Sequence, residues 1–169
     1  GLGDVYKRQE LSLAEFRTAE KLAKALRKHG FTVTENIGGT GIVAILKNGK
    51  GPLVMMRADM DGLPIEEKSG LDYASQASQL DPVTGNTFPV MHACGHDVHI
   101  TSLIGTAKQM SDRMQDWSGT LMLIGQPAEE RVLGARAMME DDLWARFGTP
   151  DYALAFHVSS ALPAGVVNV

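Results

Sequence analysis

The chain has 169 residues, of which 44% are hydrophobic and 21% charged, and its formal net charge is −4 at pH 7. These values are typical of a soluble globular domain large enough for a hydrophobic core. The net negative charge and short apolar runs argue against a nucleic-acid binder and a membrane protein. A single cysteine excludes an internal disulfide, so a reducing compartment, by default the cytoplasm, is expected.

The first nine residues match neither helical nor strand periodicity, and the N-terminus shows no signal-peptide pattern. We therefore expect residues 1–11 to be an unstructured or artefactual leader. The folded domain is expected to occupy residues 12–169.

The first predicted helix begins with a capping box over 12–15, in which Leu11 and Phe16 would form a hydrophobic staple. Basic residues in the last turn and Gly30 predict its end. One apolar face at helical spacing supports the helix, formed by Phe16, Ala19, Leu22, Ala23 and Leu26.

Alternating or continuous apolar segments predict strands at 31–35, 42–46, 53–56, 121–124, 152–156 and 166–169. Asn48-Gly49 is typical of a tight hairpin turn. A helix capped by Asp97 and a second helix over 131–141 are expected, and the polar segment 68–90 is expected to be an irregular surface excursion. Buried strands alternating with amphipathic helices predict an α/β sandwich with a mixed, largely parallel sheet.

Polar residues that can bind metal or transfer protons follow the buried strands. Asp59 and Asp61 come after 53–56, Glu129 and Glu130 after 121–124, and His157 after 152–156. Because the carboxyl ends of parallel strands share one edge of a sheet, these side chains are expected to converge.

Cys94 and His96 lie two residues apart, so both side chains would face the same way in an extended segment. A thiolate and an imidazole placed in this way can bind zinc or a similar metal, with Glu130 and His157 as further ligands. The alternative for Cys94 is a small buried apolar residue.

The adjacent pair Glu129-Glu130 fits a division of roles, in which one carboxylate binds metal and the other takes a proton from water. The alternative is a solvated helix start. His157 can instead be a hydrogen-bonded core residue. Asp59 and Asp61 can be turn residues or can orient a ligand or catalytic group.

Four ordered motifs resemble one family of amidohydrolases. They are Arg-Ala-Asp-Met-Asp-Gly-Leu-Pro-Ile-Glu-Glu (57–67), Met-His-Ala-Cys-Gly-His-Asp-Val-His (91–99), Gln-Pro-Ala-Glu-Glu (126–130) and Phe-His-Val (156–158). The chain is similar, from about Ser12 to Val169, to hippurate hydrolases, N-acyl amino acid amidohydrolases and auxin-conjugate hydrolases. These enzymes are relatives of aminoacylase and carboxypeptidase G.

The resemblance implies a three-layer, zinc-exopeptidase-like catalytic domain that hydrolyses the amide bond of small N-acyl amino acids with metal-activated water. It implies two divalent metal ions, zinc or manganese, with nickel or cobalt as alternatives. The metal ligands implied are Cys94, His96, Glu130 and His157. Glu129 is implied as the general base, and Asp59 as the aspartate that orients the site.

The family continues into a lid and dimerisation domain and a last histidine ligand. The resemblance therefore implies that residues 12–169 are the N-terminal portion of the catalytic domain and that the full-length protein is a homo-oligomer. Two alternatives remain. Cys94 can be the nucleophile of a cysteine amidase, or the chain can be a metal-binding fragment without catalytic activity.

Overall fold

The computed structural model of the protein describes residues 9–168. One five-stranded sheet has the order β1-β2-β6-β3-β7. β1 is antiparallel to β2 and β2 to β6, whereas β3 is parallel to both β6 and β7. The predicted mixed sheet is confirmed. Its strands are β1 (Thr32–Ile37), β2 (Gly41–Asn48), β3 (Leu53–Asp59), β6 (Gly119–Gln126) and β7 (Tyr152–Ala155).

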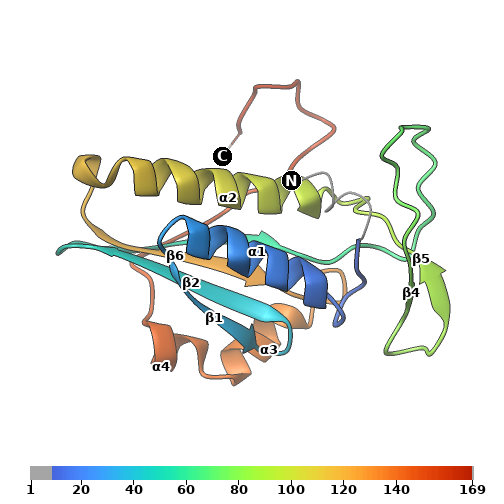
Figure 1. The fold of residues 1–169 in the computed structure, drawn as a ribbon, viewed down its shortest axis with the longest axis horizontal. Helices are drawn as coiled ribbons and strands as arrows, with labels where there is room; N and C mark the ends of the chain where they lie inside the picture. Colours follow the sequence, from blue (N-terminus) through green and yellow to red (C-terminus); the bar gives the residue numbers. More distant parts are fainter. Residues whose placement is uncertain (1–8, 169) are drawn as a thin grey trace.

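Helices cover both faces of this sheet and complete three layers (Figure 1). The helices are α1 (Phe16–Lys28), α2 (His96–Asp112), α3 (Gly134–Glu140) and α4 (Leu143–Phe147), with a short 3-10 turn at Met114–Asp116. α1 and α2 bury one apolar cluster against the sheet, and α3 and α4 bury a second cluster on the other face. In the described residues, no helix is long and apolar enough to cross a membrane.

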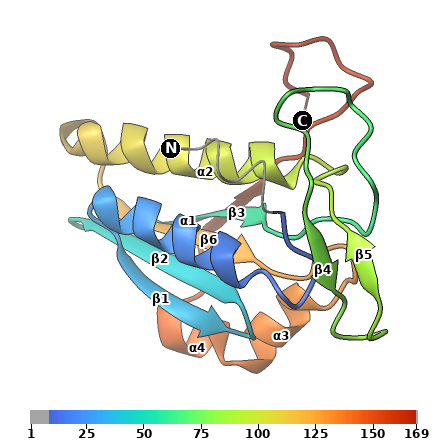
Figure 2. The ribbon, with the colours of Figure 1, turned by 45° about the vertical axis from the view of Figure 1, so that its right-hand side comes forward.

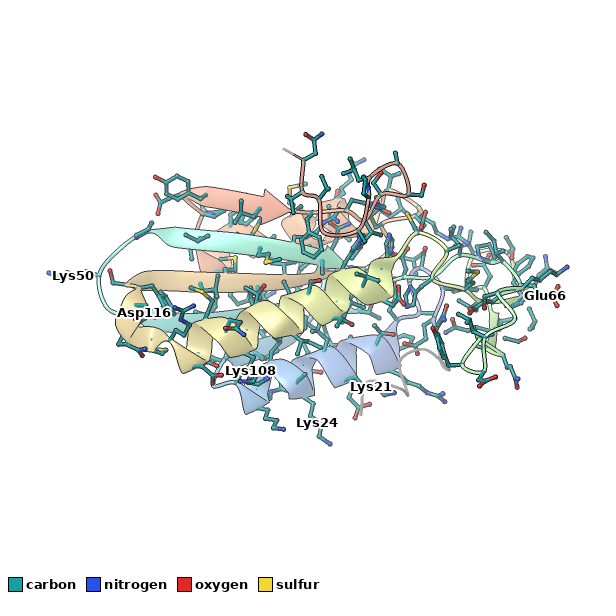
Figure 3. All side chains as sticks on the ribbon, turned by 90° about the horizontal axis from the view of Figure 1, so that it is seen from above. Lys21, Lys24, Lys50, Glu66, Lys108 and Asp116 are labelled. Atoms are coloured by element: carbon teal, nitrogen blue, oxygen red, sulfur yellow. The ribbon has the colours of Figure 1, made fainter. Side chains whose placement is uncertain are left out.

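The predicted irregular excursion contains a short hairpin, in which β4 (Ser78–Leu80) pairs with β5 (Thr87–Pro89). Figure 2 shows this hairpin beside the main sheet. In Figure 3, Lys50, just before β3, and Glu66, after it, lie at opposite ends of the molecule, so the chain continues well beyond the carboxyl end of β3. Arg131 joins the hairpin to the segment after β6 through an ion pair with Asp81, whose nearest N–O distance is 2.8 Å.

The start of α1 differs from the predicted capping box. No side-chain cap hydrogen bond forms there, and the Ser12 hydroxyl donates instead to the Asp61 carboxylate at 2.6 Å. Phe16 is 66% exposed while Leu11 is buried, so the predicted staple is wrong. The chain turns sharply at Leu13, whose φ is 69°, and this turn delays the helix and leaves Phe16 outside its buried face.

Residues 9–11, which the sequence assigned to a leader, are part of the fold. All three are buried, and Leu11 forms a bridge with Gly62. The Glu10 carboxylate accepts hydrogen bonds from the backbone N–H groups of Arg17 and Thr18, at 3.1 and 2.8 Å. Glu10 therefore satisfies the free amides of the first helical turn. Residues 1–8 lie outside the described part of the chain.

Replacing Leu22 with alanine is expected to lower the free energy of unfolding by about 2–5 kcal/mol, because Leu22 is only 1% exposed in the cluster beneath α1. The matched variant Phe16→Ala is expected to change it by less than about 0.5 kcal/mol, because an exposed side chain loses little on truncation. Urea unfolding of both variants measures the difference. Equal losses would contradict the placement of Phe16 outside the core.

The predicted Asn48-Gly49 turn does not join paired strands. β6 lies between β2 and β3, so Met122 of β6 is opposite Ile45 on one side and Met55 on the other. The turn dipeptide indicates only that the chain reverses there. The continuous apolar sequence of β6, which is buried along most of its length, fits the centre of the sheet and not its edge.

The last third of the chain departs most from prediction. β7 was expected to be buried, but Tyr152 and Leu154 are 64% and 58% exposed. The predicted strand over 166–169 is absent from residues 166–168, and in the described chain no strand pairs with the outer edge of β7. The predicted helix over 131–141 is shortened to α3. Asp97 was predicted to cap α2, but the N-cap position is occupied by Gly95, and Asp97 lies in the first turn of the helix.

Candidate metal centre

Polar segments meet at the carboxyl end of the parallel strands. Asp59 is the last residue of β3, the Glu129-Glu130 pair follows β6, and His157 follows β7. The start of α2 supplies Cys94 and His96 from above the sheet. Three groups of possible metal ligands occur in the described residues, each with its donor atoms within 4.8 Å of one another. His96 belongs to all three and is therefore central to the site.

Cys94, His96 and His157 form the first group. Cys94 Sγ lies 3.2 Å from His157 Nε2. The segment is not extended as expected: Gly95, with φ of 80°, makes the turn into α2, and a Cβ there would lie 2.3 Å from Val158 Cγ2. Glycine therefore permits both the turn and the close approach of the β7 end.

His96 and the two glutamates form the second group. His96 Nε2 lies 3.6 Å from Glu129 Oε2 and 3.7 Å from Glu130 Oε1. Among the described residues, His96 Nε2 and Glu130 Oε1 are buried polar atoms without a hydrogen-bond partner. Because such atoms are costly unless satisfied, a nitrogen and a carboxylate oxygen that face each other unpaired fit a bound metal ion.

Asp61 organises the segments that carry these possible ligands. Its backbone oxygen accepts a hydrogen bond from His96 Nδ1 at 2.8 Å, which leaves Nε2 free to bind a metal. Its carboxylate accepts hydrogen bonds from the backbone N–H groups of Glu129 and Glu130, at 3.2 and 3.1 Å. One buried aspartate thus orients the imidazole and both glutamates.

Asp59 has a different neighbour. Its carboxylate accepts a hydrogen bond from His99 Nδ1 at 2.6 Å and pairs with Arg57 at 2.5 Å. His99 Nε2 in turn accepts the backbone N–H of Val158 at 3.1 Å. Although Asp59, His96 and His99 form the third group, both nitrogens of His99 are already engaged. His99 therefore fits better as the residue that holds the segment after His157.

The carboxylates around Cys94 disfavour a free thiolate. Burial, followed by the negative charge of Glu130, raises the pKa of the Cys94 thiol to about 11. Burial also raises the pKa of Glu130. A nucleophilic cysteine needs a lowered pKa, so this environment argues against the cysteine-amidase alternative. A divalent cation would reverse the effect, because metal ligation favours the thiolate.

The pH dependence of stability is expected to carry a contribution from Asp59. Burial alone would raise its pKa, but the His99 hydrogen bond and the charges of His96 and Arg57 lower it from 3.8 to about 2. A lowered carboxylate pKa stabilises the folded state above pH 3.8, and this contribution disappears as the pH falls through 2. The difference in unfolding free energy between wild type and Asp59→Asn should shrink by about 2 kcal/mol over that interval. Urea unfolding at several pH values, with exposed Asp112→Asn as control, tests this; a constant difference would contradict it.

The sequence left two residues of the site without a specific role. Asp61 was expected to converge with the other polar side chains, as a turn residue or a general orienting group, and His99 was named only as part of a motif. The position of Asp61 directly after β3 was enough to place it near the converging side chains. It gave no sign that the Asp61 carboxylate accepts the backbone N–H groups of Glu129 and Glu130.

Comparison with known proteins places the chain in a family. The model of peptidase family M20/M25/M40 matches residues 55–169. The chain is 41% identical to the hippurate hydrolase of Campylobacter jejuni over 154 residues, which cover 90% of the chain and 37% of that enzyme. It is 35% identical to the N-acetyl-L-cysteine deacetylase of Bacillus subtilis over 161 residues, 95% of the chain and 36% of the deacetylase.

The fold has a solved counterpart in the Bacillus subtilis YXEP protein, described as a dinuclear metal binding peptidase from the M20 family. The two superimpose with a TM-score of 0.83 and 33% sequence identity, covering 97% of this chain and 43% of that one. The chain thus spans about two fifths of the length of these proteins. The family match, the sequence identities and the fold agree, and the chain belongs to peptidase family M20/M25/M40.

Proposed function

We propose that the full-length protein hydrolyses the amide bond of small N-acyl amino acids with two divalent metal ions. The observation that carries the proposal is the pair of unpartnered buried atoms, His96 Nε2 and Glu130 Oε1, beside Glu129 and the Cys94–His157 pair. The hippurate hydrolase and N-acetyl-L-cysteine deacetylase relatives support the substrate class. The M20 neighbour described as dinuclear supports two metal ions.

Cys94, His96, Glu130 and His157 are proposed to hold the metals, which polarise the substrate carbonyl and lower the pKa of water when bound. Zinc and manganese fit this mixture of sulfur, nitrogen and oxygen donors. The exposure of the two glutamates supports their division of roles. The Glu129 side chain is 36% exposed and that of Glu130 is 19% exposed, so Glu129 is the more accessible to water.

Glu129 is proposed to be the general base. It takes a proton from water while the water oxygen adds to the carbonyl carbon of the amide. When the C–N bond breaks, Glu129 gives that proton to the leaving nitrogen. The products are a carboxylic acid and a free amino acid. Asp61 keeps Glu129 in place by accepting its backbone N–H.

The test is turnover of hippurate and N-acetyl amino acids by the purified full-length protein, before and after treatment with a chelator. Activity should disappear with the chelator and return with zinc or manganese. Turnover that persists in the metal-free protein would refute the metal mechanism and favour Cys94 as nucleophile. Stoichiometric metal without turnover of any N-acyl amino acid would favour the non-catalytic alternative.

A further inference from the structure

We propose that Glu15, at the start of α1 and outside the proposed ligand set, positions the general base Glu129 by fixing the backbone of Ala128. This inference rests on the proposed function. Glu15 is therefore a positioning residue, which acts through the peptide that precedes Glu129.

Glu15 is fully buried, with 0% exposure, although it lies at a helix start where a glutamate is normally solvated. Its Oε1 accepts the backbone N–H of Ala128 at 2.7 Å and that of Leu13 at 3.1 Å. Its Oε2 bonds the hydroxyl of Thr40 at 2.5 Å. A buried carboxyl group is costly unless hydrogen-bonded, and here both oxygens are engaged. Glu15 thus joins α1, the β1–β2 turn and the segment after β6.

Ala128 has a backbone conformation that needs support. Its φ is 45°, in the left-handed region that residues with a Cβ rarely adopt, and its side chain is fully buried. Such a conformation is unfavourable for a residue with a Cβ and persists only where neighbouring contacts enforce it. The hydrogen bond from Ala128 N–H to Glu15 is such a contact. A relaxed Ala128 would redirect the chain that carries Glu129.

Three consecutive backbone N–H groups are held in this way. Glu15 accepts that of Ala128, and Asp61 accepts those of Glu129 and Glu130. Asp61 also contacts His96, so its substitution would disturb the metal site directly. The Glu15 carboxylate forms its hydrogen bonds with Leu13, Thr40 and Ala128, and none with His96. Glu15 is therefore the cleaner place to test whether the backbone sets the position of the base.

Four variants separate positioning from general stability. Glu15→Gln keeps an acceptor for the Ala128 N–H, and its amide can donate to the Thr40 hydroxyl. Glu15→Ala removes the acceptor, and Glu15→Asp retracts it by one methylene. The matched control Thr40→Val breaks the other end of the network and leaves the bond to Ala128.

In the full-length protein loaded with zinc or manganese, Glu15→Ala and Glu15→Asp are expected to lower kcat about 10–100-fold, with metal content retained and KM within about threefold of wild type. Glu15→Gln should restore kcat to within about threefold. Thr40→Val should lower Tm with kcat near wild type. Hydrogen exchange of a peptide that contains residues 128–130 should accelerate in the alanine and aspartate variants and stay slow in the glutamine variant.

A folded, metal-loaded Glu15→Ala with wild-type kcat and exchange would overturn the proposal. So would a Glu15→Gln that loses as much activity as the alanine variant, or a Thr40→Val that loses activity in proportion to Tm. If alanine and aspartate at this position prevent folding, the glutamine and Thr40→Val variants decide the question by the same criteria. If wild type turns over no N-acyl amino acid, the proposed function fails, and the exchange measurement still tests the positioning.

Discussion

Glu129→Gln is expected to lower kcat for hydrolysis of N-acyl amino acids by about 10²–10⁴-fold, the usual contribution of a general base. Glutamine has nearly the same shape but cannot accept a proton from water. Because the backbone N–H of Glu129, and not its side chain, is what Asp61 holds, the variant should keep the fold of the segment. Metal content should stay at the wild-type level. The measurement is steady-state turnover of hippurate beside elemental analysis of the same preparation.

The control for Glu129 is Glu66→Gln, which removes an exposed carboxylate just before the excursion, where it forms an ion pair with Lys68. Its kcat should equal that of wild type. A Glu129→Gln protein that binds metal and keeps more than about a tenth of wild-type kcat would rule out Glu129 as the base. Glu130 would then be the carboxylate to test next.

Cys94→Ala is expected to weaken metal binding more than about 100-fold, because even residues that only orient ligands contribute 10–100-fold. The variant removes the thiolate and leaves His157 Nε2 without its sulfur neighbour. Competition with a chromophoric chelator gives the affinity directly and does not depend on turnover. His29→Asn, at the end of α1, is the control, because it removes a side chain of a type that can bind metal from a place outside the proposed site.

The Cys94 variant also separates the two mechanisms. If Cys94 is a ligand, activity of Cys94→Ala should be recovered in part at high metal concentration. If Cys94 is a nucleophile, metal affinity should be unchanged and excess metal should restore nothing. Wild-type metal affinity in the alanine variant would therefore refute its assignment as a ligand.

Much of the fold followed from local periodicity. The apolar face of α1 and the continuous apolar segments of β3 and β6 are properties of neighbouring residues, and the sequence predicted them. The order of the strands did not follow. Asn48-Gly49 predicts a reversal, but only tertiary packing decides that β6 lies between β2 and β3. The exposure of β7 likewise depends on what covers it.

The site also has some features that local sequence predicts and others that depend on tertiary packing. Glu130 and His157 were named because they follow apolar strands at one sheet edge. Cys94 and His96 were named because they lie two residues apart, and the family resemblance implied all four as ligands. Whether they bind metal is still a prediction. The role of Glu15 could not be predicted, because its partner is a backbone N–H 113 residues away and any residue type supplies that group. Side-chain motifs are visible in a sequence, whereas side-chain to backbone contacts are not.

The central place of β6 has a consequence for how the chain reaches its native state. β2 and β3 are close in sequence but do not pair with each other. β2 pairs locally with β1, but the pairing of both β2 and β3 with β6 joins segments at least 60 residues apart. Such non-local pairing slows folding, because the entropy cost of closing a long loop comes before the stabilising contacts between the strands can form. The segment with Glu129 and Glu130 follows β6 directly, so the proposed ligands come together only after that strand has docked. Metal uptake during refolding should consequently report the last stage of sheet assembly.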